Sequence, residues 1–255
     1  MKPYKNLLIV LIAIILSACS APFASAAPSN SPADTNTASL PGIVTFVDPV
    51  LEAMIRGAMG KPEGDITLAE AQRVTRMDLS HELQNFISEE PPVTDLSGLE
   101  SFTNLEVLDL SQNAVVDISP LAWLTKLTTL SLAGNPVADI APLAKLTNLK
   151  HLILSDCQAP DYSPLSNLAN LNVLLLDNST ISDVSPLASL TNLQTLYLDN
   201  SRVEDFSSLE NIFTALANKD FIIPHTLKEL GFNLDLDRHE AIYDSEMASF
   251  TIHHE

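Results

Sequence analysis

The sequence predicts an α/β solenoid, in which one short unit of chain repeats and each unit stacks on the unit before it. The first observation is an uninterrupted period of 22 residues, with five full blocks and a partial sixth that begin at Asp95, Asp117, Asp139, Asp161, Asp183 and Asp205. The second is that every full block contains the pattern Leu-x-x-Leu-x-Leu. The third is a composition of 46% apolar but only 5% aromatic residues, which predicts an aliphatic core.

The N-terminus has the pattern of an export signal. Lys2 and Lys5 precede an apolar run from Leu7 to Leu16, which is shorter than the roughly 20 residues of a membrane-spanning helix and fits a signal peptide. The tetrapeptide Leu16-Ser17-Ala18-Cys19 follows it and resembles the lipobox of bacterial lipoproteins. The resemblance implies cleavage before Cys19 and a diacylglyceryl group on its sulfur, so residues 1–19 are predicted to be a lipoprotein signal peptide. The alternative is an ordinary signal peptide that is cut after Ala24-Ser25-Ala26.

Two further segments precede the repeats. Residues 20–43 are rich in small residues, Pro and Asn without an apolar period, and they predict a disordered tether. Residues 44–79 predict a helical N-terminal cap that leads into a first strand. Asp48 and Pro49 suit the start of one helix, Gly60 suits its end, and Thr67-x-x-Glu70 matches a capping box.

Each repeat predicts one short strand. The last two leucines of every triad alternate with another residue, so that one face of the strand points inward. Successive strands are expected to lie parallel, about 4.8 Å apart. The triads are Leu105/Leu108/Leu110, Leu127/Leu130/Leu132, Leu149/Leu152/Leu154, Leu171/Leu174/Leu176 and Leu193/Leu196/Leu198.

These blocks resemble the leucine-rich repeat, in the 22-residue form found in bacterial internalin-like surface proteins. The resemblance covers roughly residues 44–212 and assigns residues 80–212 to the repeats. It implies short parallel strands on a concave face, a 3₁₀ or irregular convex side, and a helical N-terminal cap. It also implies a ladder of side chains that bond buried backbone groups at the turns, at Asn113, Asn135, Cys157, Ser179 and Ser201. Only two of these five are Asn, so we expect irregularity in the later coils.

The repeat pattern stops after Ile212. Residues 213–232 are predicted to cap the open end of the stack, with Phe213, Leu216 and the run from Phe221 to Ile223 as covering side chains. Residues 233–255 are interpreted as an acidic tail.

Composition and motifs exclude several functional classes. The 13 basic and 32 acidic residues give a formal charge of -19, which argues against nucleic-acid binding. No phosphate-binding glycine motif occurs. We interpret the repeated aspartates as caps of their own turns, Cys157 as a structural residue, and His239, His253 and His254 as parts of a solvated tail. The sequence predicts no enzyme, no metal site and no cofactor.

The outward strand positions are the best candidates for binding a partner. Ile153, Leu175 and Tyr197 fall in one column of the sheet, and apolar side chains on an exposed face mark protein interfaces. The predicted set is Val107, His151, Ile153, Val173, Leu175, Asp177, Tyr197 and Asp199. The alternatives are that the chain's own C-terminal segment covers this patch, or that the patch is incidental.

Together these features predict a non-catalytic, monomeric, extracytoplasmic module. The lipid on Cys19 would anchor it to the bacterial cell membrane or surface, and the concave face would recognise another protein. The alternative function is a structural or assembly lipoprotein of the cell envelope without a specific soluble ligand.

Overall fold

The computed structural model describes residues 42–81, 91–219, 239–244 and 249–254. The predicted signal peptide with Cys19, most of the predicted tether and the run Phe221–Ile223 lie outside these residues. Within the described part of the chain, no helix is long and apolar enough to span a membrane.

Helix α2 (Pro49–Met59) begins and ends where the sequence predicts. The Asp48 side chain accepts hydrogen bonds from the Val50 and Leu51 amides, and Pro49 is the first helical residue. Gly60 ends the helix in the left-handed conformation, with φ 62°, which glycine adopts without a steric penalty. The helix buries Leu51 and Ile55 in the core.

Helix α3 (Leu68–Ala71) has the predicted capping box, in which Thr67 and Glu70 satisfy each other's backbone amides. The predicted tether is wrong at its last two residues, which belong to the cap. Ile43 forms a bridge with Thr67, and the Gly42 carbonyl accepts a hydrogen bond from the Leu68 amide. These backbone bonds order the chain two residues before the predicted boundary.

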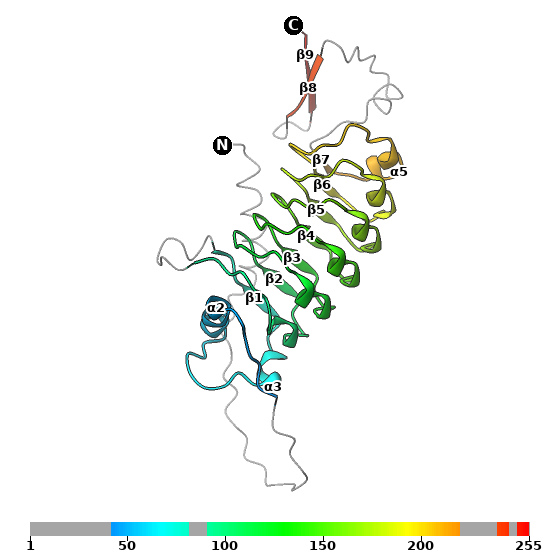
Figure 1. The fold of residues 1–255 in the computed structure, drawn as a ribbon. Coiled ribbons are helices and arrows are strands. Elements are labelled where there is room, and N and C mark those ends of the chain that lie inside the picture. The colour runs from blue at the N-terminus through cyan, green and yellow to red at the C-terminus, as the bar shows by residue number, and fades with distance from the viewer. Residues whose placement is uncertain (1–41, 82–90, 220–238, 245–248, 255) are drawn as a thin grey trace. The chain divides into compact units, whose positions relative to one another are not determined.

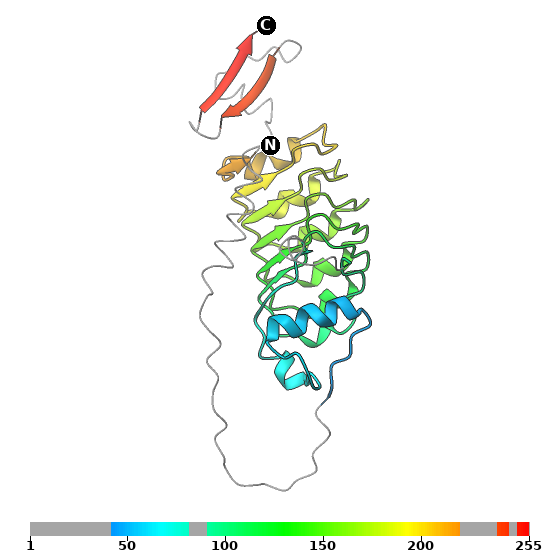
Figure 2. The same ribbon diagram turned by 90° about the vertical axis from the view of Figure 1, so that its left-hand side faces the viewer.

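The repeats form one parallel sheet of seven strands in sequence order (Figure 1). Strand β1 (Arg76–Asp78) follows the cap and pairs with β2 (Val107–Asp109). The remaining strands are β3 (Thr129–Ser131), β4 (His151–Ile153), β5 (Val173–Leu175), β6 (Thr195–Tyr197) and β7 (Asn218–Lys219). Figure 2 shows α2 and α3 at the β1 end of this stack.

The convex side consists of short 3₁₀ helices, one per coil. They are η1 (Leu99–Ser101), η2 (Ser119–Trp123), η3 (Ala141–Lys145), η4 (Ser163–Asn167), η5 (Ser185–Ser189) and η6 (Ser207–Leu209). Proline is the second residue of η2 to η5, where its missing amide costs nothing. The leucines of the triads and of these helices fill the space between the two sides and are almost fully buried.

The end of the repeats is closed by α5 (Glu210–Phe213) and β7, with Ile212, Phe213 and Leu216 buried. The sequence interpretation missed a hairpin further on. Strands β8 (His239–Asp244) and β9 (Ser249–His254) pair antiparallel, with Tyr243 opposite Phe250. Both segments contain the alternation of apolar and polar residues that is typical of strands. The acidic residues of the region favour a solvated tail instead, which is the interpretation given above.

Candidate functional site

The strands place two columns of side chains on the outward face of the sheet. The middle residue of each strand points into the core, so its two neighbours point the other way. Strand pairing without any shift aligns Val107, Thr129, His151, Val173 and Thr195 in one column, and Asp109, Ser131, Ile153, Leu175 and Tyr197 in the other. The columns are therefore continuous across five coils.

The cap adds residues to this face that the sequence analysis missed. Strand β1 pairs Arg76 with Val107 and Asp78 with Asp109, so both columns begin one coil earlier than predicted. The signal was Met77 followed by Leu79, an alternation equivalent to the end of a leucine triad. The sequence predicts a first strand at the end of the cap, but the predicted columns begin only at the first complete leucine triad.

The structure corrects the expectation that the apolar column is open to solvent. Ile153 and Leu175 are only 2% and 4% exposed, and Val107 is also buried. Ile153 and Leu175 are each flanked on both sides by a column neighbour at strand spacing, which removes part of their accessible surface. Tyr197, Val173 and His151 remain half-buried, so the accessible part of the face lies around them.

His151 is held as a neutral, fixed group. Its Nδ1 lies 3.2 Å from the Thr129 hydroxyl in the same column. Burial lowers the pKa of His151, and the neighbouring Lys150 adds to the effect. The imidazole therefore contributes hydrogen bonding rather than charge at neutral pH.

Ser131 is a buried polar residue of this face whose hydroxyl lacks a hydrogen bond within the described residues. Its side chain is 2% exposed, and its hydroxyl has no hydrogen-bond partner in the described part of the chain. An unpaired buried polar group costs about 1–3 kcal/mol.

Acidic side chains follow the strands. The Asp109 carboxylate accepts hydrogen bonds from the Ser111 amide and hydroxyl. Asp177 accepts one from the Asp199 amide at 3.2 Å and lies 3.5 Å from the Ser155 hydroxyl. The two Asp177 contacts join neighbouring coils along the edge of the sheet, so Asp177 and Asp199 lie beside the columns.

The ladder geometry is present at both asparagines. The Asn135 amide oxygen accepts from the Val115 amide at 3.0 Å, and its nitrogen donates to the Leu110 and Leu132 carbonyls. Asn113 makes the equivalent contacts with the Val93 amide and with the Leu79 and Leu110 carbonyls. Each asparagine thus links two coils.

The other ladder positions do less. The Cys157 thiol donates to the Leu132 carbonyl at 3.4 Å, and burial raises its pKa to about 12, which suppresses thiolate reactivity. Ser179 is buried and its hydroxyl is unpaired within the described residues, because a hydroxyl is shorter than an amide. Ser201 is only half-buried.

The aspartates at the start of the blocks cap their own turns, as predicted. Asp117, for example, accepts from the Ser119 amide at 2.8 Å. The other members make the same bond two residues ahead: Asp95, Asp139, Asp161, Asp183 and Asp205. In the ranges that the structure covers, no group of His, Cys, Asp or Glu is placed to hold a metal ion.

A second set of asparagines, on the outer edge, was not predicted. Asn148, Asn170 and Asn192 donate to the carbonyls of Thr125, Thr147 and Ala169 in the preceding coils, at 2.8–2.9 Å. The sequence feature that indicates this set is the dipeptide Asn-Leu, which recurs just before several of the strands.

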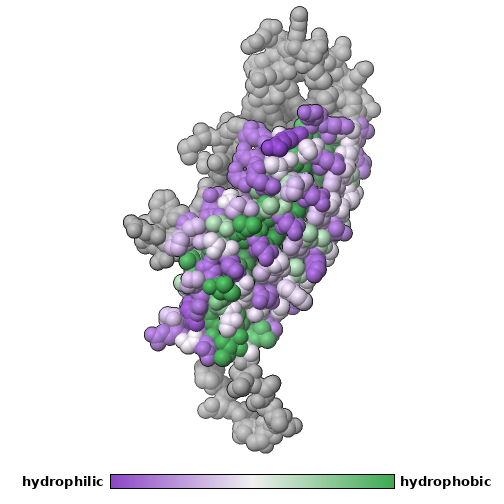
Figure 3. Space-filling model, in the orientation of Figure 1, coloured by the Kyte–Doolittle hydropathy of each residue, from purple (hydrophilic) through white to green (hydrophobic). Residues whose placement is uncertain are grey.

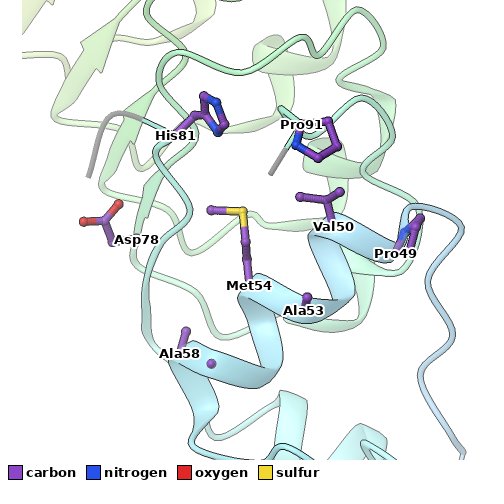
Figure 4. A pocket seen from close by; sticks show the side chains of 9 residues that line it. Pro49, Val50, Ala53, Met54, Ala58, Asp78, His81 and Pro91 are labelled. Atoms are coloured by element: carbon purple, nitrogen blue, oxygen red, sulfur yellow. The ribbon is translucent and has the colours of Figure 1, made fainter. Parts of the chain in front are cut away.

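A pocket of about 560 Å³ opens between helix α2 and the β1 end of the columns (Figure 4). Val50, Ala53 and Met54 of the helix form its apolar wall, and Asp78 and His81 provide polar groups. The cap also contains many of the hydrophobic residues visible in Figure 3.

Comparisons with known proteins identify the repeats. A family model described as Leucine Rich repeats (2 copies) matches residues 125–168 and 169–211. The crystal structure of an internalin, InlF, from Listeria monocytogenes matches with a TM-score of 0.56 and 31% identity, over 72% of this chain. A leucine-rich repeat protein from Leptospira interrogans matches with a TM-score of 0.50, 20% identity and 60% coverage of this chain, which supports the fold alone.

This chain spans 59% of the internalin chain and 38% of the Leptospira chain. No curated protein gives a match. The chain therefore contains a leucine-rich repeat solenoid of internalin-like structure, and leucine-rich repeats are a general module for protein–protein interaction.

Proposed function

We propose that this protein recognises another protein through the outward face of its parallel sheet, while a lipid on Cys19 anchors it to the cell membrane or surface. The proposal rests on one observation. On the aligned strands, the half-buried Tyr197, Val173 and His151 form the accessible part of the face, with an acidic edge beside them.

Three features of the face support recognition rather than catalysis. The half-buried Tyr197 offers a large apolar surface with a polar tip, a common anchor in interfaces. Val173 and His151, which are also half-buried and pair across neighbouring strands, add apolar and hydrogen-bonding surface to the same face. The charged residues lie at the edge, as in an interface with a polar rim.

The test combines cell-surface crosslinking with substitution of the anchor. Partners are first identified by crosslinking on intact cells and mass spectrometry, and their capture is then measured for Tyr197→Ser. For a true anchor we expect a loss of about 2 kcal/mol or more in binding free energy, which is about 30-fold in Kd. The melting temperature should change little.

Val116→Ser is the matched control, because Val116 is exposed but lies outside the two columns. It should retain capture. A large fall in the melting temperature of Tyr197→Ser would show that the chain itself covers the face. Unchanged capture by Tyr197→Ser would favour the alternative of a structural envelope lipoprotein, for which this face needs no ligand.

The anchor has a separate test. A thioether requires the Cys19 sulfur, so Cys19→Ala should abolish palmitate labelling and partitioning into the detergent phase. Cys157→Ala is the control and should be labelled normally. Labelling that persists in Cys19→Ala would overturn the lipobox assignment.

A further inference from the structure

The convex side carries an exposed aromatic residue that the proposed function does not use. Trp123 is the last residue of η2 and is 65% exposed. It is the single tryptophan of the chain. The Lys145 ammonium lies 5.8 Å from the centre of its ring, one coil further along. Since η2 lies across the core from the sheet (Figure 1), this surface is separate from the two columns.

Two cations of the repeats lie close to this ring, Lys145 in space and Lys126 along the chain. Between residues 77 and 201 the chain contains three cations, Lys126, Lys145 and Lys150, in a sequence with a net charge of -19. Lys126 follows Trp123 by three residues in the same coil, and its ammonium donates to Asn104 at 2.7 Å. Lys150 belongs to the sheet side instead: its amide bonds to the Thr128 carbonyl, which places it directly before β4 and next to His151.

These lysines are not used to neutralise the chain's own acids. All three are exposed, and none forms an ion pair with a residue that the structure describes. The nearby Asp117 and Asp139 are committed to their turns.

We propose that the surface formed by Trp123, Lys126 and Lys145, the tryptophan–lysine surface, binds an acidic peptide segment of a partner protein. Tryptophan supplies the large apolar anchor that dominates protein interfaces. The unpaired lysines supply charge complementarity for carboxylates, which directs partner choice in an otherwise acidic molecule. A peptide that carries one apolar side chain among glutamates meets both requirements.

Because the chain contains a single tryptophan, its fluorescence reports directly on this surface. The full chain in detergent is titrated with a labelled peptide of glutamates around one leucine, and binding is followed by Trp123 emission and by label anisotropy. We expect a saturable change in both signals. The Lys126→Gln/Lys145→Gln variant should bind at least tenfold more weakly, and Trp123→Ala should do the same by anisotropy.

The matched control is Arg73→Gln/Arg202→Gln, which removes two exposed cations away from this surface and should bind as the parent does. Tyr197→Ser should also bind the peptide normally, which separates this proposal from the sheet-face function. Melting temperatures close to the parent's show that the variants are folded.

Three results would overturn the proposal. Equal weakening by both double variants would mean unspecific charge attraction. Tighter, lysine-dependent binding of dextran sulfate would assign the surface to an anionic polysaccharide. Concentration-dependent self-association of the parent without peptide, measured by sedimentation and lost in Trp123→Ala, would assign it to a second copy of this chain.

Discussion

One residue in each coil has a left-handed backbone conformation, just before the ladder position. The φ angles are 60° at Gln112, 69° at Gly134, 64° at Asp156 and 56° at both Asn178 and Asn200. Gly and Asn tolerate this region, whereas a longer side chain costs about 1–2 kcal/mol there. The turn therefore stores strain at Gln112.

Replacing that residue should stabilise the fold. Gln112→Gly is expected to raise the free energy of unfolding by about 0.5–1 kcal/mol, because relief of the strained φ outweighs the added freedom of the unfolded chain. Chemical denaturation measures the change. Gln194→Gly, at an exposed position without a positive φ, should lower stability instead. A loss in both variants would show that the Gln112 side chain contributes more than its backbone costs.

At the scale of elements, the N-terminal cap is held by carboxylates. Asp48 bonds to the start of α2 and also to the Thr94 and Asp95 amides, which joins the cap to the first repeat. Burial tends to raise the pKa of Asp48, but these backbone hydrogen bonds outweigh it and leave the pKa lowered. The hydrogen bond from Lys61 and the capping box with Thr67 lower the pKa of Glu70 to about 2.

Depressed pKa values imply acid sensitivity with a defined sign. Glu70 is ionised more readily in the folded chain, so its contribution is present above the ordinary pKa of 4.5 and is lost as the pH falls towards 2. The free energy of unfolding should decline over this window. Glu70→Gln should be less stable at neutral pH but lose less on acidification, as measured by denaturation at several pH values. The control, Glu63→Gln, should follow the parent, and an unchanged slope in Glu70→Gln would contradict the assignment.

At the scale of the molecule, stability is transmitted from coil to coil. Each repeat contacts only its neighbours, and the ladder asparagines are the polar links between them. Asn135 bonds to Leu110 in the coil before it and to Leu132 in its own coil. A break at this point should therefore weaken both neighbouring interfaces.

Asn135→Leu tests this transmission. It leaves the Val115 amide and buried carbonyls unpaired, at a cost on the order of 1–3 kcal/mol. Hydrogen exchange should speed up in β2, β3 and β4 more than in the cap. Asn148→Leu removes an exposed asparagine with one backbone bond to Thr125 and should cost less than 1 kcal/mol. An equal loss of unfolding free energy in the two variants would contradict the distinction between the inner and outer asparagines.

Much of the architecture follows from the sequence because its cause is local and repeated. The 22-residue period, the leucine triads and the Asp-led turns predict strands, 3₁₀ helices and their order. Asp48 and Gly60 predict both ends of the first cap helix, and the Thr67–Glu70 pair predicts the start of the second. Each of these signals acts over a few residues, so a single segment contains all the information needed.

Other properties depend on residues that are 22 positions apart and meet only when coils stack. The low exposure of Ile153 and Leu175, the unpaired hydroxyl of Ser131 and the extension of the columns to Arg76 and Asp78 belong to this class. So does the approach of Lys145 to Trp123. The sequence by itself determined that the chain is a repeating solenoid with an aliphatic core. Only the tertiary structure decided which outward side chains are covered and which lysine approaches Trp123, because both depend on the register between coils.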